Sequence, residues 1–317
     1  MKILPIGVVG CGVLGSRHAE IYKSLPDVQL VGIYDISESR AQSLANRLNV
    51  KAFANLNDLT REIQAASVCT PAVSHHDVAS PLLLSGLHLL VEKPIATSLK
   101  DADHLIQLAQ NKSLILQTGH VERFNGAVMT VKNIVHNPLF IECDRIGYFD
   151  PRISDVGVVL DLMIHDIDII LYLVNSKVID VQAFGMSVLS KTEDFANVRL
   201  RFANGAIANL TASRMAQKRI RKLRIFEENR YISLDYYQQE ALTFSKDSGY
   251  TSESFYQPLD IRKTNSLEDE LKHFVGCIQG TQKPRVKNEE ARAALDVALQ
   301  ILQQIEPSHA KTVRHNR

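Results

Sequence analysis

The chain has 317 residues, of which 45% are hydrophobic and 22% charged, and its formal net charge is +1. This length exceeds the roughly 100–200 residues of one domain, and the composition is that of a soluble globular protein. So small a net charge favours neither nucleic acid nor a membrane as partner, and no hydrophobic run approaches the ~18 residues of a membrane span. The four cysteines are scattered without a C-x-x-C pair, so we expect a reducing cytoplasm, without disulfides or zinc.

Strand-like and helix-like segments alternate over residues 1–121. Strands are expected at Ile3–Val9, Gln29–Asp35, Ala65–Cys69, His88–Val91 and Leu114–Thr118, and helices at Gly15–Leu25, Ser37–Leu48, Ser74–Ser85 and Ser98–Asn111. This alternation predicts a parallel sheet with right-handed crossovers. We therefore expect an α/β domain of the doubly wound, Rossmann type.

From residue 122 on, strand-like runs follow one another without helices between them. Helices are expected at Glu122–His136, Val158–Leu173, Leu267–Cys277 and Glu289–Ile305, and strands at Val178–Val188, Val198–Phe202, Ala206–Ser213, Leu223–Phe226 and Tyr231–Asp235. This order predicts a second, α+β domain over residues 122–317 with an open, largely antiparallel sheet. Because such a sheet has a face or an edge to cover, we expect a homodimer or homotetramer.

A glycine-rich sequence, Gly10-Cys11-Gly12-Val13-Leu14-Gly15, lies between the first strand and the first helix. Glycines there let the backbone turn tightly and approach a pyrophosphate at the helix N-terminus. Asp35 follows Gly15 by 20 residues, as ribose recognition requires, and Ile36 is assigned to the same cofactor site. The carboxylate favours NAD over NADP, although Arg40 softens that preference. The alternative is a glycine turn that binds no ligand.

Lys93 stands in Glu92-Lys93-Pro94, directly after an apolar strand, at the edge where open α/β sheets bind ligands. Thr70-Pro71 ends the preceding strand at the same edge, and His75 opens the next helix. We assign Thr70, Pro71, His75, Glu92 and Lys93 to the cofactor site, with Lys93 also at the substrate. The alternatives are an ordinary surface lysine and a histidine whose ring is satisfied locally.

Asp161 and His165 are spaced i, i+4, which places them on one face of a helix that is otherwise almost wholly apolar, and Asp168 shares that face. A buried acid and imidazole need partners. A structural pair in the core is one alternative, and a metal site is not expected because a third ligand is missing. Lys93, Asp161 and His165 together supply the cation, anion and imidazole that alcohol oxidation needs.

These motifs resemble the glucose–fructose oxidoreductase / inositol dehydrogenase / MocA (GFO/IDH/MocA) family. The likeness covers the whole chain and rests on the glycine loop, Thr70-Pro71 with His75, Gly86-Leu87-His88 before Glu92-Lys93-Pro94, and Asp161-x-x-x-His165. The resemblance implies an NAD(P)-binding first domain and a second domain that carries substrate and oligomer contacts. It also implies that Lys93, Asp161 and His165 are catalytic, with His165 as proton acceptor and Lys93 polarising or relaying, although the formal base is either of these two across the family, and that Pro94 is cis.

In one place the chain departs from the family. Many members have a run of glycines before the Asp161 helix, whereas this chain reads Ser154-Asp155-Val156-Gly157. The geometry of the substrate loop is therefore left open.

Two segments, His120–Asn125 and Val159–Asp168, resemble the nucleotide-sugar 3-dehydrogenases of this family. This implies oxidation of a sugar 3-hydroxyl to a ketone, with a UDP-N-acetylglucosamine-type nucleotide sugar as substrate. The basic run Lys218–Arg224 suits a diphosphate, its alternative being a solvated face of an edge strand. Further substrate-side candidates are Arg123, Asn125 and Arg152. The alternative functions are an inositol or free-polyol dehydrogenase and a non-catalytic regulator that senses the dinucleotide.

Overall fold

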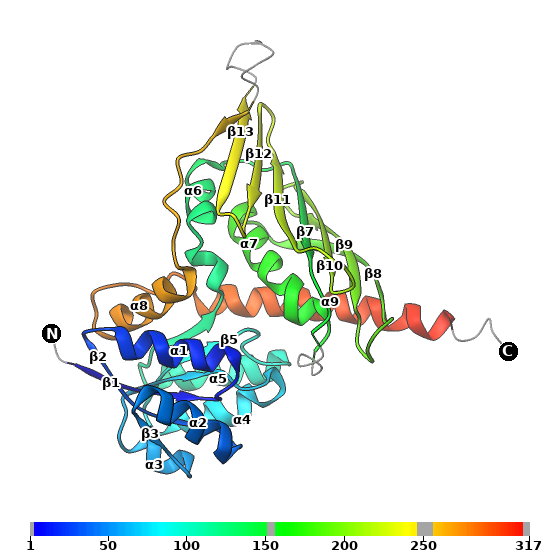
Figure 1. Cartoon of the computed structure of the whole chain (residues 1–317). Helices are drawn as coiled ribbons and strands as arrows, with labels where there is room; N and C mark the ends of the chain where they lie inside the picture. The colour runs from blue at the N-terminus through cyan, green and yellow to red at the C-terminus, as the bar shows by residue number, and fades with distance from the viewer. Residues whose placement is uncertain (1–2, 151–155, 246–255, 313–317) are drawn as a thin grey trace. The chain divides into compact units, whose positions relative to one another are not determined.

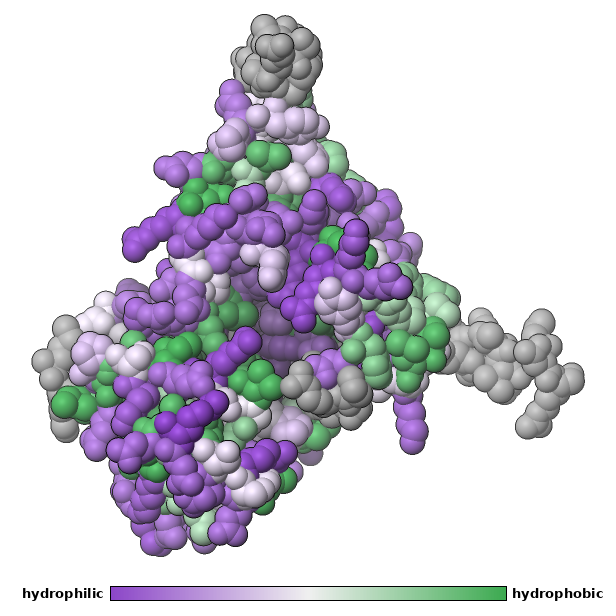
Figure 2. All heavy atoms as spheres, viewed as in Figure 1, coloured by the Kyte–Doolittle hydropathy of each residue, from purple (hydrophilic) through white to green (hydrophobic). Residues whose placement is uncertain are grey.

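The computed structural model describes residues 3–150, 156–245 and 256–312 of the chain. The chain folds into two compact units, Met1–Val121 with Leu267–Arg292, and Glu122–Ser266 with Ala293–Arg317. Among the described residues, none of the helices has the length and hydrophobicity that crossing a membrane would require. Hydrophilic residues dominate the surface seen in Figure 2, and hydrophobic residues form separate patches among them.

The first unit contains a six-stranded, wholly parallel sheet in the order β3-β2-β1-β4-β5-β6 (Figure 1). Its strands are β1 (Leu4–Val9), β2 (Val28–Tyr34), β3 (Lys51–Ala52), β4 (Ala65–Val68), β5 (His88–Glu92) and β6 (Leu116–Gly119). The order reverses between β1 and β4, so the carboxyl ends of these two strands border the crevice where such sheets bind ligands. The predicted doubly wound parallel sheet is confirmed.

Helices connect these strands at α1 (Val13–Ser24), α2 (Glu38–Leu48), α3 (Leu56–Thr60), α4 (His75–Leu84) and α5 (Leu99–Asn111), with a short 3-10 turn, η1, at Ala72–Ser74. Two of them begin where the sequence offers a capping serine. Ser37 accepts a hydrogen bond from the Arg40 amide, and Ser98 accepts one from the Asp101 amide at 3.1 Å. Such caps stabilise a helix by about 1 kcal/mol each.

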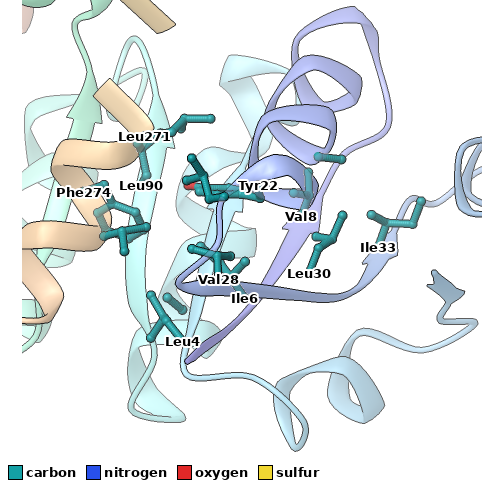
Figure 3. Close-up of a cluster of buried hydrophobic side chains, with 14 of the residues drawn as sticks. Leu4, Ile6, Val8, Tyr22, Val28, Leu30, Ile33, Leu90, Leu271 and Phe274 are labelled. Atoms are coloured by element: carbon teal, nitrogen blue, oxygen red, sulfur yellow. The ribbon is translucent and has the colours of Figure 1, made fainter. Parts of the chain in front are cut away.

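The core of the first unit includes a helix from far along the chain, α8 (Ser266–Ile278). Figure 3 shows its Leu271 and Phe274 beside residues of β1, β2 and β5 and Tyr22 of α1. Leu271, Phe274 and Val275 lie at helical spacing and are at most 1% exposed. Burying a side chain of this size contributes about 1.5–3 kcal/mol. The helix lies within the range assigned from the sequence to the second domain, and its apolar stripe explains why it packs here.

The second unit contains an eight-stranded sheet in the order β14-β13-β12-β11-β7-β10-β9-β8. Its strands are β7 (Phe140–Ile146), β8 (Val178–Met186), β9 (Phe195–Phe202), β10 (Ile207–Ser213), β11 (Ile220–Phe226), β12 (Arg230–Asp235), β13 (Glu240–Ser245) and β14 (Gln257–Pro258). All neighbouring pairs are antiparallel except β10 with β7. The predicted, largely antiparallel sheet is confirmed.

The central strand β7 is absent from the sequence prediction. Ile141, Cys143 and Arg145 are buried on one face, whereas Glu142 and Asp144 lie on the other. Charged residues on both faces hide the alternation that usually reveals a strand. The stretch expected to form a long loop holds β14 in its described part, and residues 246–255 lie outside the described residues.

Helices cover one face of this sheet, as α6 and α7 show in Figure 1. The elements are η2 (Val121–Phe124), α6 (Gly126–Ile134), η3 (Val159–Met163), α7 (Ile164–Val174) and α9 (Asn288–Thr312). Two predicted helices are corrected here. Residues 122–136 form a 3-10 turn and a separate helix that Asn125 caps, and residues 158–173 begin with a π-helical turn, η3.

Candidate active site

The three glycines of the loop after β1 each meet a different steric demand. Gly10 has φ +95°, and a Cβ there would lie 2.6 Å from the Cys69 carbonyl oxygen. A Cβ on Gly15 would lie 1.8 Å from the Gly10 oxygen, whereas one on Gly12 would meet no atom of the described residues within 4 Å. The loop is thus tightly closed at both ends and open at its centre. This is the arrangement that lets a pyrophosphate approach the N-terminus of α1.

Asp35, at the end of β2, is held against this loop. One carboxylate oxygen accepts the Cys11 amide at 2.7 Å, and the other accepts the Ser37 amide and the Arg40 guanidinium, each at 2.8 Å. Burial alone would raise the pKa of Asp35, but these hydrogen bonds outweigh it and lower the pKa. The carboxylate is therefore ionised and positioned beside the loop. Ile36, next along the chain, is 89% exposed.

Cys11 lies within the loop but does not act as a nucleophile. Burial, together with the neighbouring Asp35 charge, raises the pKa of its thiol to about 12. Since the thiolate is the reactive form, the side chain stays an inert thiol at neutral pH. Val13 and Leu14 open α1 directly behind it.

The ring of His75 joins the ends of β4 and β5. Its Nδ1 lies 2.7 Å from the Pro94 carbonyl oxygen, and its Nε2 lies 2.9 Å from the Thr70 carbonyl oxygen. The peptide bond between Lys93 and Pro94 is cis. The ring thus holds the turn after Lys93 to the turn after β4, with both nitrogens occupied by backbone oxygens. Burial lowers the pKa of His75, and the two carbonyls only partly offset this.

Glu92 is buried beside Lys93, which is itself half-buried. A carboxylate oxygen of Glu92 lies 3.1 Å from Nε2 of His18 on α1. Nδ1 of His18 lies 3.0 Å from the Ser67 hydroxyl, which also bonds Tyr22. Burial would raise the pKa of Glu92, but the His18 hydrogen bond and nearby positive charge lower it. His18 is not among the site residues expected from the sequence. The signal that could have indicated it is a histidine on the buried face of α1.

Asp161 and His165 lie at the junction of η3 and α7 in the second unit, and both are half-buried. The regular α-helical spacing expected from the sequence is corrected here, because Asp161 belongs to the π-helical turn. Such turns are often found at functional sites. Asp168, placed on the same face from the sequence, is instead buried in an ion pair.

Arg123 and Asn125 take structural positions in the second unit. Nε and Nη2 of Arg123 lie 2.6 and 2.8 Å from the two carboxylate oxygens of Asp168, and both side chains are 1% exposed. The Asn125 amide donates to Glu122 and to the Tyr236 carbonyl, while its oxygen caps α6. These contacts explain both residues as parts of the core rather than of a substrate surface. Arg152 lies outside the described residues.

A pocket of about 140 Å³ lies beside Asp161. Its walls belong to the second unit and include four arginines. The lining residues are Arg145, Ile146, Gly147, Tyr148, Asp150, Asp161, Leu162, Arg214, Arg219 and Arg221. The predicted basic run contributes the last two, and its alternative interpretation as an edge strand is wrong, because β11 lies between β12 and β7. Arg145 and Arg214 were missed, since isolated arginines in a sequence give no signal.

The two missed arginines are fixed by buried acids behind the pocket. Arg145 forms two 2.8 Å hydrogen bonds to Asp166 and one of 3.1 Å to Glu122. Nε of Arg214 donates to Asp194 at 2.7 Å. Among the described residues, no group of three or more His, Cys, Asp or Glu side chains could hold a metal ion. The pocket is therefore an arginine-lined cavity with two acids on its wall, Asp150 and, in the η3 turn, Asp161.

A glycine loop and an ionised β2 aspartate on a doubly wound sheet, followed by an α+β unit, define a dinucleotide-dependent oxidoreductase. Comparison with known proteins supports this class. Residues 4–120 match an oxidoreductase family with an NAD-binding Rossmann fold, and residues 124–232 match the GFO/IDH/MocA C-terminal domain. The chain belongs to the GFO/IDH/MocA family of oxidoreductases.

Two relatives match nearly the whole chain. UDP-N-acetylglucosamine 3-dehydrogenase from Acidithiobacillus ferrooxidans is 33% identical over 303 residues, which cover 93% of this chain and 95% of the relative. A solved structure of that enzyme aligns with a TM-score of 0.90, covering 97% of this chain and 99% of the other. Myo-inositol 2-dehydrogenase from Thermotoga maritima is 29% identical, covering 92% of each chain.

A more distant solved structure shows the same fold. GenD2 from gentamicin A biosynthesis, solved in complex with NAD, aligns with a TM-score of 0.83 at 20% identity and covers 96% of this chain and 94% of that one.

Proposed function

We propose that this protein oxidises the 3-hydroxyl of a UDP-N-acetylglucosamine-type nucleotide sugar to a ketone, with NAD as the acceptor. The observation that carries the proposal is the likeness to UDP-N-acetylglucosamine 3-dehydrogenase over nearly the full length of both chains. The arginine-lined pocket beside Asp161 supports it, because a diphosphate is the anionic part of such a substrate.

NAD is favoured over NADP because of Asp35. Its ionised carboxylate can accept a hydrogen bond from a ribose 2′-hydroxyl and would repel a 2′-phosphate. The Arg40 guanidinium, which would otherwise attract that phosphate, is paired with the same carboxylate. The open centre of the glycine loop at Gly12 fits the pyrophosphate. When bound, the nicotinamide ring would take up the hydride that leaves the sugar carbon.

We propose that the imidazole of His165 accepts the proton of the reacting hydroxyl and that Asp161 stabilises the imidazolium that forms. We assign to Lys93 the stabilisation of the negative charge that develops on the same oxygen in the transition state, since an ammonium group is positively charged. The buried, ionised Glu92 supports this by placing a fixed negative charge directly before the lysine. Asp161 stands on the wall of the arginine pocket, as a residue acting at the sugar would.

Following the absorbance of NADH with UDP-N-acetylglucosamine, free N-acetylglucosamine and myo-inositol as substrates tests the proposal. We expect turnover with the nucleotide sugar at low concentration and little with the other two. The likeness to a myo-inositol 2-dehydrogenase favours the second candidate, a polyol dehydrogenase. Efficient turnover of myo-inositol without turnover of UDP-sugars would replace the first proposal by the second.

The catalytic assignment has its own test. Lys93→Ala and His165→Asn should each lower kcat by about 10²–10⁴-fold while NAD affinity stays within a few-fold of the wild type. Lys112→Ala removes an exposed lysine at the end of α5 and is the matched control. A variant at Lys93 or His165 that keeps full activity would remove that residue from the mechanism, whereas a wild type that binds NAD but oxidises none of the three substrates would favour a dinucleotide-sensing regulator.

We also propose that the protein is a homodimer or homotetramer. Strand β8 is an edge of the eight-stranded sheet and carries Phe184 and Met186, which are 54% and 39% exposed. An exposed edge with hydrophobic side chains favours association. Light scattering coupled to size-exclusion chromatography measures the mass, and a 35.4 kDa species at micromolar concentration would contradict the proposal.

A further inference from the structure

The basic run Lys218–Arg224 lies partly before strand β11, which begins at Ile220, and partly on the two faces of that strand. Leu223 and Ile225 are fully buried on the face that the helices cover. Arg221 shares the parity of these residues, and it lines the arginine pocket together with Arg219, which precedes the strand. Lys222 has the opposite parity and is exposed, and Arg224 on that side pairs with Asp144 at 3.2 Å. Only part of the run is therefore directed at the pocket.

Within the pocket, Arg145 and Arg214 are balanced by the buried acids behind them, whereas Arg219 and Arg221 are not balanced in this way. Among the described residues, the carboxylate that pairs with Arg221 is Glu122 at 3.9 Å, and Glu122 is already bonded to Arg145. The Arg219 guanidinium lies 5.4 Å from the centre of the Tyr148 ring, and no carboxylate among the described residues pairs with it.

The surroundings of Arg221 show what this imbalance costs. Burial lowers the pKa of Arg221, and the positive charge of Arg145 lowers it further. Both effects disfavour the charged guanidinium. A bound anion would offset the repulsion from Arg145 and replace the hydration that Arg221 loses on burial. Guanidinium groups bind phosphate oxygens through paired, charge-assisted hydrogen bonds, which makes phosphate the matching anion.

The position of Asp161 on the same pocket wall narrows the choice of anion. In a nucleoside diphosphate sugar, the ring carbon that bears the 3-hydroxyl is separated by a single ring carbon from the anomeric carbon, which carries the diphosphate. A reacting hydroxyl near Asp161 therefore brings the diphosphate close to it, within the reach of one small pocket. A sugar phosphorylated at its 6-position presents its phosphate from the other side of the ring.

Building on the proposed function, we propose that Arg219 and Arg221 bind the diphosphate of the nucleotide sugar and thereby select nucleotide sugars over free sugars and inositols. Arg145 and Arg214 position the pocket walls through their ion pairs with Asp166 and Asp194.

UDP binding to the full chain, measured by calorimetry at saturating NAD so that the glycine loop is occupied, tests the inference. Arg219→Ala and Arg221→Ala should each raise the Kd for UDP about tenfold or more, because each removes charge-assisted hydrogen bonds. Lys222→Ala removes the same charge from the opposite face of the strand and should leave the Kd unchanged. Arg221→Lys, which keeps the charge, should recover part of the lost affinity.

Kinetics gives a second measurement. In the two alanine variants, KM for UDP-N-acetylglucosamine should rise about tenfold or more, while KM for NAD stays unchanged. The inference is overturned if the wild type does not bind UDP, if the arginine variants bind it as Lys222→Ala does, or if glucose 6-phosphate binds in preference to UDP. If UDP binds as expected but no UDP-sugar is oxidised, the diphosphate site stands and the proposed function fails.

Discussion

Nε2 of His18 and Oε1 of Glu92 lie 3.1 Å apart in the first unit, and both side chains are buried. Ser67 and Tyr22 continue the contact from the other nitrogen of the His18 ring. Since Glu92 directly precedes Lys93, this network fixes the backbone from which the lysine projects. Three elements, α1, β4 and β5, therefore contribute to the position of one functional side chain.

We predict that Glu92→Gln lowers the free energy of unfolding by about 1.5–3 kcal/mol, because the charge-assisted hydrogen bond between the buried carboxylate and His18 is replaced by a weaker, neutral one. Urea unfolding followed by circular dichroism measures this. Glu62→Gln is the matched control, because Glu62 pairs with Lys51 at the surface, where an ion pair contributes about 0–1 kcal/mol. Equal losses in the two variants would show that the His18 contact is not stabilising.

The cofactor preference should depend on Asp35. Asp35→Asn removes the negative charge that disfavours a 2′-phosphate and weakens the acceptor for a ribose hydroxyl. We expect kcat/KM for NAD to fall about tenfold and the ratio of NADP to NAD activity to rise. In Asp35→Asn, Arg40 is no longer paired with a carboxylate and can attract the 2′-phosphate. Adding Arg40→Ala to this variant should therefore lower NADP activity again. An unchanged NADP to NAD ratio in Asp35→Asn would contradict the assignment.

The sequence predicted the parts of the first unit that depend on local pattern. The glycine spacing, the aspartate 20 residues later and the alternation of strands and helices all follow from short-range rules, and the structure confirms the sheet they imply. The loop needs glycine at Gly10 because its φ is positive, which is a property of the local backbone. Features of this kind can be inferred from a single sequence.

The parts that were missed depend on contacts between distant residues. Arg145 pairs with Asp166, 21 residues away, and His18 meets Ser67, 49 residues away. No periodicity relates such residues. The π-helical turn around Asp161 was likewise hidden, because its apolar neighbours fit a regular α-helix equally well. The walls of the pocket next to Asp161 depend on such distant contacts, as Arg145 shows, so only its arginines from the basic run, Arg219 and Arg221, could be suspected from the sequence.

A third prediction concerns pH and His75. Burial places the pKa of His75 below its ordinary 6.5, so the unfolded chain binds the proton more readily than the folded one. The stabilisation is fully present above pH ~6.5 and is lost as the pH falls through the folded-state pKa. His75→Asn should therefore flatten the fall of the unfolding free energy between about pH 7 and pH 5.

The contributions of His88 and His273, whose pKa values are also lowered by burial, will remain in that variant. His104→Asn, at an exposed position, should keep the wild-type slope and is the control. Thermal unfolding at several pH values gives both slopes. A slope in His75→Asn that equals the wild-type slope would show that this ring does not titrate differently on folding.

The final prediction concerns Asp194, which is fully buried in the second unit. One of its oxygens accepts the amides of Val188, Leu189 and Ser190 at 2.7, 2.6 and 3.0 Å, and the other accepts Nε of Arg214 at 2.7 Å. Burial alone would raise the pKa of Asp194, but these hydrogen bonds lower it well below its usual range. A lowered pKa means that the stabilisation is present above the ordinary value of 3.8 and is lost as the pH falls through the folded-state pKa.

Asp194→Asn should therefore lower the free energy of unfolding by about 3–5 kcal/mol at pH 7, because Arg214 is left buried without its counter-charge. As the pH falls from 3.8 toward the lower folded-state pKa, the wild type progressively loses this contribution, so the difference between the two proteins should shrink. Asp180→Asn, on the edge strand β8, is the control and should change the stability by less than about 1 kcal/mol. Urea unfolding at pH 7 and below pH ~3.8 provides the comparison. A loss that stays constant with pH would mean that packing, rather than the charge of Asp194, stabilises this part of the sheet.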